Sequence, residues 1–588
     1  MCGIIGYKGG DQAVSIVLEG LKTLEYRGYD SWGIAFLDGT GLQVKKNVGK
    51  IGNFKGFKAL PEANLALGHT RWATHGGVTQ SNAHPHLSNN KRIAVAHNGI
   101  VENYQALRKR LQAAGYTFHS QTDTETIPLL VEDFLKKGDD FPTAVRHTCL
   151  LLEGRYSFIV LDADSGQLIG ARNGSPLLAG LGKDEFFLAS DIPAFLPHTN
   201  QVVFLDDQQL VLIDSALRLF DLRSGKQLPV KPQKISWTPE QAEKGKFPHF
   251  MLKEILEQRE SVSRALVQDD EQLEKIAQLI TRAKQTVLVG CGTAGKMCLA
   301  GTYLFAKIAG RQTHFCVGSE FPNFAPFVGP DTLVIAVSQS GETADTLEAL
   351  SIAKKRGAKV VSLLNVYGST MMRQSDYNLL INAGPEKAVA STKAATGQLA
   401  VLALLAYATA GRLAEGRKAL QIASAALART LDDAQCKRLK ALAQKIKAKE
   451  NLYIIGRGLH YPIALESAIK LQEVSYIHAE GFAGGELKHG PIALIEKRTP
   501  CIVLAACDET QAEVLSNAME VKSRGAYIIG LAPQDNEVFD LHLPVPDLGI
   551  ASAIAELVPV QLLAYYLAVL RGNDPDKPRN LAKSVTVK

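Results

Sequence analysis

The sequence predicts an α+β domain of stacked antiparallel sheets with helices, followed by two doubly wound α/β domains with parallel sheets. Short β-rich runs separated by Gly and Asn turns fill residues 2–220. Beyond residue 250, apolar strands alternate with Ala- and Leu-rich helical stretches, which is typical of a parallel sheet. This second part also repeats itself, which indicates two copies of one domain.

The repeat appears at two places with nearly the same offset. Val287-Leu-Val-Gly290 resembles Tyr453-Ile-Ile-Gly456, 166 positions further on. Lys355-Arg-Gly357 resembles Ser523-Arg-Gly525, at an offset of 168. Two anchors at one spacing indicate a duplication. Because ligands of such sheets bind at the carboxyl ends of the strands, the loops after these strands are the candidate sites.

Four segments follow from these patterns. The first domain covers residues 2–220, a linker covers 221–250, and the two α/β domains cover 251–425 and 426–588. The linker is polar, contains Lys and Pro, and has no sustained apolar periodicity. A chain of 588 residues also exceeds what one hydrophobic core organises.

Composition narrows the class of protein. The net charge of +6 is small for this length and its Lys and Arg residues are dispersed, so we expect no nucleic-acid partner. The eight cysteines form no CxxC pair and have no metal-ligand spacing with His, so we expect no metal site. For the chain as a whole we expect no cofactor. No signal-peptide pattern opens the chain, which favours the cytoplasm. The apolar stretch 550–570 contains Glu556 and Pro559, which indicates a core helix and no membrane contact.

Cys2 is a candidate nucleophile. Removal of Met1 would leave a thiol and a free α-amine on the same residue. An α-amine titrates near pH 7.7 to 8.0, so it can accept the thiol proton at neutral pH. The alternative is that Cys2 is an ordinary small residue beside the initiator methionine.

Three polar clusters, at 68–76, 97–99 and 120–125, lie at the ends of predicted strands and supply what a glutamine site needs. Arg71 can bind an α-carboxylate in bidentate fashion, and Asp123 can hold an α-ammonium. The Asn98 amide and the Gly99 N–H can stabilise a tetrahedral oxyanion. Taken singly, each residue is also compatible with a turn or a surface ion pair.

Together with Cys2, these clusters resemble, in the family's order, the N-terminal-nucleophile (Ntn) hydrolase domain of class II glutamine amidotransferases. The resemblance implies Cys2 as nucleophile and base, and Asn98 with Gly99 as the oxyanion hole. It further implies the following roles: glutamine binding by Arg71, Thr74, His75 and Asp123, a gate at Trp72, and positioning of the nucleophile by Arg27. Trp32 departs from the small residue expected there, which could shift the first helix.

Two loops of the second part are candidate anion sites. Gly290-Cys-Gly292-Thr-Ala-Gly295 matches a dinucleotide fingerprint, with Glu320 as a possible ribose ligand, so NAD binding stays open. Its near match to a P-loop fails because Met297 replaces the hydroxyl that would hold magnesium. The hydroxyl-rich turn 338–343 favours a sugar phosphate, although an N-capping turn would look similar.

Further motifs resemble the paired sugar-isomerase (SIS) domains of the glutamine:fructose-6-phosphate amidotransferase family; they are the segments 338–343, 390–393, 461–466, 478–480, 485–491 and 578–587. The resemblance implies conversion of D-fructose 6-phosphate and L-glutamine to D-glucosamine 6-phosphate and L-glutamate, the first step of an amino-sugar pathway. Ammonia released at Cys2 would pass to the isomerase site.

The same resemblance implies roles for individual residues. Lys583 would form a Schiff base with the C2 carbonyl, with Lys470 beside it, and Glu473 would move a proton from C1 to C2. His489 would open the sugar ring from the neighbouring subunit, which requires a homodimer. The sugar phosphate would be held by Thr293, Ser338, Gln339, Ser340 and Thr343. Lys470 and Glu473, three positions apart on a helix, could also form a surface ion pair.

Positions of the second part also depart from the family pattern. Ala294 replaces an expected phosphate-binding Ser, a loss of roughly 0.5 to 1.5 kcal/mol that Lys296 could offset; Gln472 replaces an expected Lys and receives no role.

A sugar-phosphate-binding regulator with a relic glutaminase should have lost Cys2, Lys583 or His489. A class II amidotransferase with a different acceptor would need a pyrophosphate or ATP loop.

Overall fold

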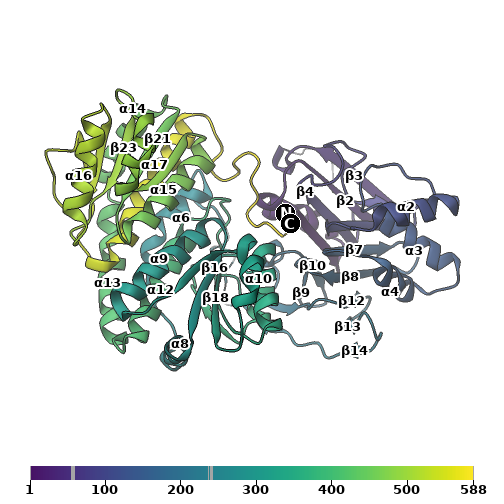
Figure 1. The fold of residues 1–588 in the computed structure, drawn as a ribbon. Helices are drawn as coiled ribbons and strands as arrows, with labels where there is room; N and C mark the ends of the chain where they lie inside the picture. Colours follow the sequence, from purple (N-terminus) through teal and green to yellow (C-terminus); the bar gives the residue numbers. More distant parts are fainter. Residues whose placement is uncertain (1, 54–59, 236, 239–240, 242, 587–588) are drawn as a thin grey trace. The chain divides into compact units, whose positions relative to one another are not determined.

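The computed structural model describes residues 2–53, 60–235, 237–238, 241 and 243–586. The chain forms two compact units (Figure 1). Unit 1 comprises Met1–Glu243 and Ala582–Lys588, and unit 2 comprises Lys244–Leu581.

Unit 1 contains two antiparallel sheets. The eight-stranded sheet has the order β15 (Gln233–Lys234), β11 (Gln201–Phe204), β9 (Leu178–Leu181), β10 (Phe186–Ala189), β1 (Gly3–Lys8), β4 (Leu65–Arg71), β2 (Ser31–Asp38) and β3 (Gly41–Val48). The seven-stranded sheet has the order β14 (Gln227–Leu228), β13 (Leu217–Asp221), β12 (Gln209–Ile213), β8 (Gln167–Asn173), β7 (Tyr156–Asp162), β6 (Ile93–Gly99) and β5 (His86–Leu87).

The two sheets of unit 1 stack face to face with helices outside. Ile4, Leu67, Leu161 and Leu188 belong to the core between the sheets. Helix α1 (Ala13–Leu24) covers the outer face of the eight-stranded sheet. Helices α2 (Tyr104–Ala113), α3 (Thr126–Lys136) and α4 (Phe141–Leu151) cover the other sheet. The predicted stack of antiparallel sheets is therefore confirmed.

The predicted linker, residues 221–250, takes part in both sheets of unit 1. β14 lies within it and pairs with β13, Leu228 opposite Leu219, and β15 pairs with β11, Lys234 opposite Gln201. The compact unit 1 accordingly extends to Glu243.

Unit 2 contains two parallel sheets. The first has the order β17 (His314–Val317), β16 (Gln285–Gly290), β18 (Thr332–Ser338), β19 (Lys359–Leu364) and β20 (Tyr377–Leu380). The second has the order β22 (His478–Ala483), β21 (Asn451–Gly456), β23 (Pro500–Leu504), β24 (Tyr527–Ala532) and β25 (Leu541–Pro544). Both follow the chain order 2-1-3-4-5, which confirms the duplicated doubly wound fold. The direction of winding reverses between the first and third strands, and sheets of this type bind ligands at that point on the carboxyl edge.

The helices of unit 2 join the two sheets into one core (Figure 1). They are α6 (Phe250–Leu256), α7 (Gln258–Ala265), α8 (Asp270–Arg282), α9 (Gly292–Ala309), α10 (Ala344–Lys355), α11 (Thr370–Gln374), α12 (Lys393–Thr409), α13 (Leu413–Thr430), α14 (Asp433–Ile446), α15 (His460–Ser475), α16 (Gln511–Lys522) and α17 (Ser552–Leu570). Helix α9 of the first sheet packs against α12 and also against α15 of the second.

Helix α17 is the most apolar helix-forming stretch of unit 2. By length and composition the segment Gly549–Leu570 could cross a membrane, and no other helix among the described residues passes that test. In the structure 83% of its apolar window is buried, where it packs against α14 and α15. The predicted core helix is confirmed.

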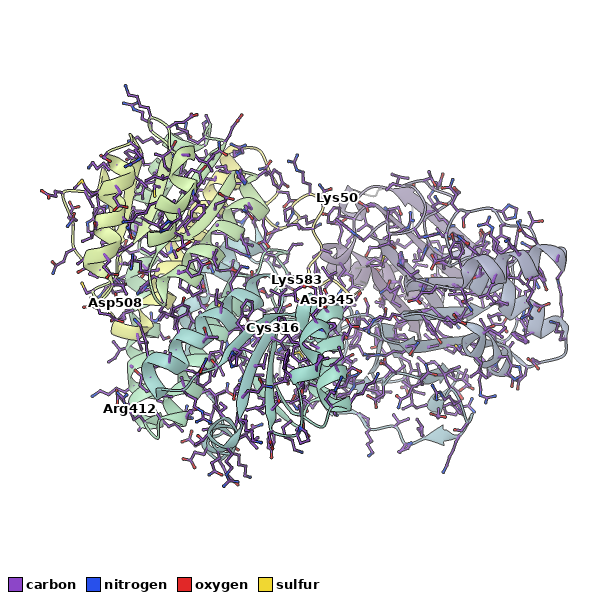
Figure 2. The ribbon with its side chains drawn as sticks, viewed as in Figure 1. Lys50, Cys316, Asp345, Arg412, Asp508 and Lys583 are labelled. Carbon is purple, nitrogen blue, oxygen red and sulfur yellow. The ribbon has the colours of Figure 1, made fainter. Side chains whose placement is uncertain are left out.

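A buried ion network crosses this core. His460 Nδ1 lies 2.6 Å from Glu556 of α17, and Nε2 lies 3.3 Å from Asp508. Figure 2 labels Asp508. Lys307 of α9 approaches Asp508 at 3.1 Å. Burial alone would lower the pKa of His460, but the two carboxylates raise it to about 10. The imidazole is therefore charged in the folded protein at neutral pH.

Replacement of His460 by Ala should lower the free energy of unfolding of unit 2 by about 3 to 5 kcal/mol, because Glu556 would remain buried without its partner. The charge of His460 stabilises fully below its unfolded pKa of about 6.5, and this contribution is lost as the pH rises through about 10. Denaturant titrations followed by circular dichroism should thus show a smaller difference from wild type at pH 10 than at pH 7.

Lys275→Ala, which removes an exposed ion pair with Glu271, is the matched control and should leave the midpoint unchanged. An equal effect of His460→Ala at both pH values would contradict the assignment of a charged imidazole.

Candidate functional site

Unit 1 brings Cys2, Trp72, Asn98 and Gly99 together at adjoining strand ends. The Trp72 N–H donates to Cys2 Sγ at 3.2 Å, and Asn98 Nδ2 donates to the Cys2 carbonyl at 3.0 Å. Gly99 has a φ of 121°, and a Cβ there would lie 2.0 Å from the Arg155 carbonyl, so only glycine fits. The thiol thus lies beside an amide that can donate to a developing oxyanion.

The Cys2 thiol needs a base. Burial raises its pKa, and the Trp72 N–H and the Arg71 charge only partly oppose this effect. A thiol with a raised pKa is largely protonated at pH 7, so a neighbouring group must accept its proton before attack. The α-amine of Cys2 itself would be available for this after removal of Met1.

Arg71 and Asp123 are both buried, and the side chain of each forms hydrogen bonds to backbone groups. Arg71 donates to the carbonyls of Gly76 and Gly77, each at 3.0 Å, and to that of His75. Asp123 accepts the Val101 N–H at 2.7 Å. These loop-supporting contacts could not be predicted from the sequence, because they depend on how the loops fold.

The other predicted glutamine-site residues surround this region. Thr74 is exposed, and the His75 ring packs edge-on against Tyr104 at 4.6 Å. The Trp72 ring packs edge-on against Tyr29 at 5.4 Å. Trp32 is buried in the core between its sheet and α1.

Arg27 is fixed by an ion pair. Its Nη2 lies 2.6 Å and its Nε 3.1 Å from Asp191 Oδ2, and Tyr26 also donates to this carboxylate. Burial opposes the charge of Arg27, but Asp191 outweighs it and raises the guanidinium pKa. The partner of Arg27 is far away in the sequence, so it could not be predicted.

Four buried histidines, which we call the histidine cluster, lie beside Asn98; they are His69, His84, His86 and His97. The His84 ring centroid lies 4.2 Å from that of His69 and 4.9 Å from that of His86. Burial lowers the pKa of all four, that of His69 to about 3, so the cluster is neutral at pH 7. Within the described residues, no group of three or more His, Cys, Asp or Glu is arranged to hold a metal ion.

The histidine cluster should make unit 1 sensitive to acid. Below the unfolded histidine pKa of about 6.5 the unfolded chain binds more protons than the folded unit, so the free energy of unfolding falls as pH drops. All three tryptophans (32, 72 and 237) lie in unit 1, so their fluorescence follows this unit alone. Denaturant titrations at pH 7 and 5 should show the loss, and His86→Gln should reduce the proton uptake on unfolding by about one.

Leu130→Ala, a cavity variant in α3, is the control: it should lower stability equally at both pH values. An unchanged proton uptake in His86→Gln would show that His86 is not held neutral.

In unit 2, a buried lysine lies at the switch point of the first sheet. Lys470 Nζ lies 2.5 Å from Glu473, 3.0 Å from the Thr293 hydroxyl and 3.5 Å from Glu466. The Lys470 and Glu466 side chains are 0% exposed. Burial would lower the Lys470 pKa, but Glu473 and Glu466 reverse this effect and raise it.

Glu466 was missed as a site residue, although it stands four positions before Lys470 on α15 and so shares its helix face. Its Oε1 accepts from Thr293 at 3.0 Å, and its Oε2 has no hydrogen-bond partner. Burial raises its pKa to about 7, against the opposing effect of Lys470. Thr293, predicted to bind phosphate, therefore bridges Glu466 and Lys470 in this structure.

The hydroxyl-rich turn follows β18, next to the loop after β16. Ser338 Oγ accepts the Gly341 N–H at 3.0 Å, and Ser340 Oγ accepts the Glu342 N–H at 3.2 Å. Thr343 caps α10. Gly341 has a φ of 66°, which suits glycine. The turn is thus preformed at a helix N-terminus on the carboxyl edge.

The remaining predicted residues lie outside these contacts. Gln339 accepts the Asn365 N–H through its carbonyl at 3.1 Å. Lys296 is on α9, one turn after Gly292. His489 is exposed at the end of a 3₁₀ segment, Gly484–His489. Lys583 belongs to the C-terminal segment that groups with unit 1.

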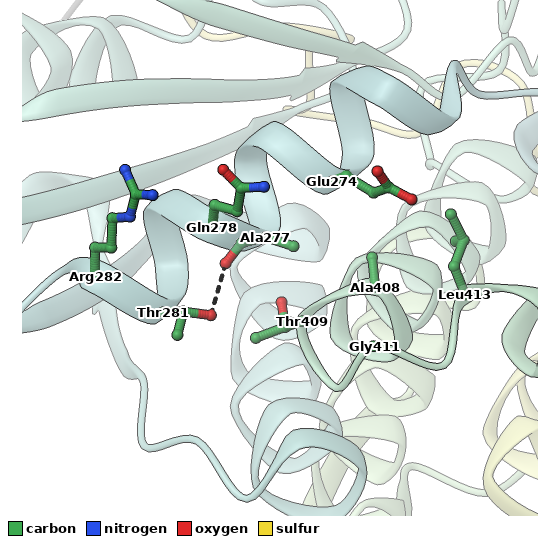
Figure 3. A pocket seen from close by; sticks show the side chains of 9 residues that line it. All are labelled: Glu274, Ala277, Gln278, Thr281, Arg282, Ala408, Thr409, Gly411 and Leu413. Carbon is green, nitrogen blue, oxygen red and sulfur yellow. Dashed lines mark hydrogen bonds between the residues drawn. The ribbon is translucent and has the colours of Figure 1, made fainter.

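The second sheet uses its switch point differently. Helix α15, which follows β21, begins with His460, and the loop after β23 contains Asp508, so the buried ion network lies where the first sheet has hydroxyl side chains. A separate open groove of about 350 Å³ lies between α8 and the turn joining α12 to α13 (Figure 3). None of the predicted site residues lines it.

Comparison with known proteins defines the class. A glutamine amidotransferase domain model matches residues 69–197, and an SIS domain model matches residues 279–408 and 445–571. The chain is thus a glutamine amidotransferase domain joined to two SIS domains.

The family follows from full-length relatives. The chain is 43% identical over 609 aligned positions to the glutamine–fructose-6-phosphate aminotransferase (isomerizing) of Thermococcus kodakarensis, covering 100% of both chains. It is also 43% identical to that of Thermus thermophilus, again over 100% of both chains. The chain belongs to the family of glutamine–fructose-6-phosphate aminotransferases, and the predicted resemblance is confirmed.

Solved structures resemble unit 2. The C-terminal domain of glucosamine-fructose-6-phosphate aminotransferase from Francisella tularensis is 34% identical with a TM-score of 0.54, covering 57% of this chain and 99% of that one. Tagatose-6-phosphate ketose/aldose isomerase from Escherichia coli, 18% identical with a TM-score of 0.50 over 56% of this chain and 96% of its own, shares the fold.

Proposed function

We propose that this chain transfers the amide nitrogen of L-glutamine to D-fructose 6-phosphate, yielding L-glutamate and D-glucosamine 6-phosphate, the first step of an amino-sugar pathway. The observation that carries the proposal is the 43% identity, over the whole chain, to relatives that bear this activity in their name. The Cys2 thiol of unit 1 beside an amide donor, and the Glu473 carboxylate of unit 2 held by Lys470, support the proposal.

Glutamine cleavage begins at Cys2, with unit 1 acting as an Ntn hydrolase. The thiol attacks the amide carbonyl while the Cys2 α-amine accepts its proton, and the oxyanion receives hydrogen bonds from Asn98 Nδ2 and the Gly99 N–H. Collapse of the intermediate releases ammonia and leaves a thioester, which water hydrolyses to glutamate. The short distance between Asn98 Nδ2 and the Cys2 carbonyl supports this assignment.

Substrate binding and gating complete this half-reaction. Arg71, Thr74, His75 and Asp123 bind glutamine, Trp72 gates the ammonia, and Arg27 positions Cys2. The ion pair of Arg27 with Asp191 supports a positioning role, because it fixes the guanidinium near the first strand.

At the sugar site, His489 of the partner subunit opens the ring of fructose 6-phosphate. The Lys583 amine condenses with the C2 ketone and expels water, ammonia displaces the lysine, and Glu473 moves a proton from C1 to C2 to give the aldose amine. Lys470, 2.5 Å from Glu473, fixes the position of that carboxylate for the proton transfer. Thr293, Ser338, Gln339, Ser340 and Thr343 hold the sugar phosphate.

Two further aspects belong to this proposal. The enzyme is a homodimer, since His489 is exposed at the end of its segment and available to a second copy. It works in the cytoplasm, and its eight free cysteines suit a reducing compartment.

Two variants should separate the half-reactions. Cys2→Ala should lower glutamine-driven synthesis of glucosamine 6-phosphate by at least about 10³-fold, because the nucleophile is lost, yet retain synthesis from ammonium chloride. Lys583→Ala should lose both syntheses and retain glutamine hydrolysis. Chromatographic assays of sugar amine and glutamate measure both.

The two variants are each other's control, since each should spare what the other abolishes. Glutamine-driven synthesis by Cys2→Ala would show that Cys2 is not the nucleophile. Ammonia-driven synthesis by Lys583→Ala would show that the reaction does not require a Schiff base on Lys583.

A further inference from the structure

Helix α15, which carries Lys470 and Glu473, ends in an unusual way. Its C-cap residue Tyr476 has φ 59° and ψ 24°, in the left-handed region. Helices commonly place Gly or Asn at such a position, because a Cβ is strained there and a bulky side chain is a clear outlier. A strained backbone persists only where its surroundings fix it, and it is frequent at functional sites.

One residue of the C-terminal tail fixes Tyr476 from two sides. The backbone N–H of Arg579 donates to the Tyr476 hydroxyl at 2.7 Å. The Arg579 guanidinium lies over the same ring, 4.2 Å from its centroid. The polar end and the face of one aromatic ring are therefore both bound by a single residue.

Two other contacts hold the tail to the same unit. Asn573 Nδ2 donates to the carbonyls of Val474 and Ser475 at 3.2 and 3.3 Å. Both belong to the last turn of α15, where helix carbonyls have no donor within the helix. The buried Asp576 carboxylate accepts the Phe250 and Met251 N–H groups at 2.8 Å each. The stretch 573–581 forms no helix or strand, so contacts of this kind set its course.

We propose that Tyr476 and Arg579 are positioning residues that align the tail with helix α15 for the sugar reaction. Tyr476 stands three residues after Glu473, and Arg579 stands four residues before Lys583. Their contact therefore ties the residue proposed to move the C1 proton to the residue proposed to form the imine. The inference rests on the proposed roles of Glu473 and Lys583.

Local stability alone would favour glycine at position 476, since glycine relieves the left-handed strain. A tyrosine there gives up this advantage and gains the tail contact. The conflict separates a structural role from a positioning role: Tyr476→Gly should keep or raise stability while it impairs the reaction.

The test uses the full-length enzyme and three measurements: the thermal midpoint, the steady-state constants of ammonia-driven synthesis, and borohydride trapping of fructose 6-phosphate on Lys583, followed by peptide mass spectrometry. Tyr476→Phe and Tyr476→Gly should each lower kcat and the trapping rate by about tenfold, with the KM for fructose 6-phosphate unchanged, because the lysine is misplaced but the phosphate site is intact. Tyr476→Gly should do so without a lower midpoint.

Tyr527→Phe is the matched control. The Tyr527 ring also carries a cation, Lys445 at 3.9 Å, but lies on β24. Its kcat and trapping rate should equal those of wild type.

The outcomes are distinguishable. If the wild-type enzyme traps the sugar on Lys583, and Tyr476→Phe has the same trapping rate and the same kcat as wild type, this inference alone is overturned. A kcat of the variants that falls only in proportion to their thermal midpoint would also overturn it. A wild-type enzyme that makes glucosamine 6-phosphate but traps no sugar on Lys583 would overturn the proposed imine, and this inference with it.

Discussion

The buried charge of Lys470 constrains the architecture of unit 2. Its side chain is 0% exposed, and an unpaired ammonium there would cost several kcal/mol. The fold must therefore bring Glu466, Glu473 and the Thr293 hydroxyl to within 3.5 Å of one nitrogen. Glu466 and Glu473 come from the same helix turns, but Thr293 comes from the first sheet. Hence the two α/β domains must pack as one core for the lysine to remain ionised.

The duplication explains why one copy of the sheet differs from the other. Both sheets have the same strand order, and both place loops at a switch point on the carboxyl edge. The first switch point carries short hydroxyl side chains and a glycine turn. At the second, His460 at the start of α15 contacts both Asp508, in the loop after β23, and Glu556 of α17. The second copy thus supplies a charged core contact that the first does not have at this place.

Sequence patterns predicted the parts of this structure that depend on local regularity. The offset between Gly290 and Gly456 correctly indicated two copies, and the alternation of strands and helices indicated their parallel sheets. Strand pairing within the predicted linker could not be foreseen, because β15 pairs with β11, a strand more than thirty residues away. Glu466, the histidine cluster and the Asp191 partner of Arg27 were missed for the same reason: burial and pairing arise from tertiary contacts. The left-handed backbone of Tyr476 could not be predicted either, because the residue that contacts its side chain, Arg579, lies about a hundred positions further along the chain.

The central claim is that one chain moves nitrogen from an amide to a sugar. Glutamine labelled with ¹⁵N at its amide, supplied with fructose 6-phosphate and no ammonium salt, tests this claim directly when the products are followed by NMR. The account predicts ¹⁵N in the amino group of glucosamine 6-phosphate, one label for each glutamate formed. Release of glutamate with all of the label in free ammonium, and none in the sugar, would contradict it.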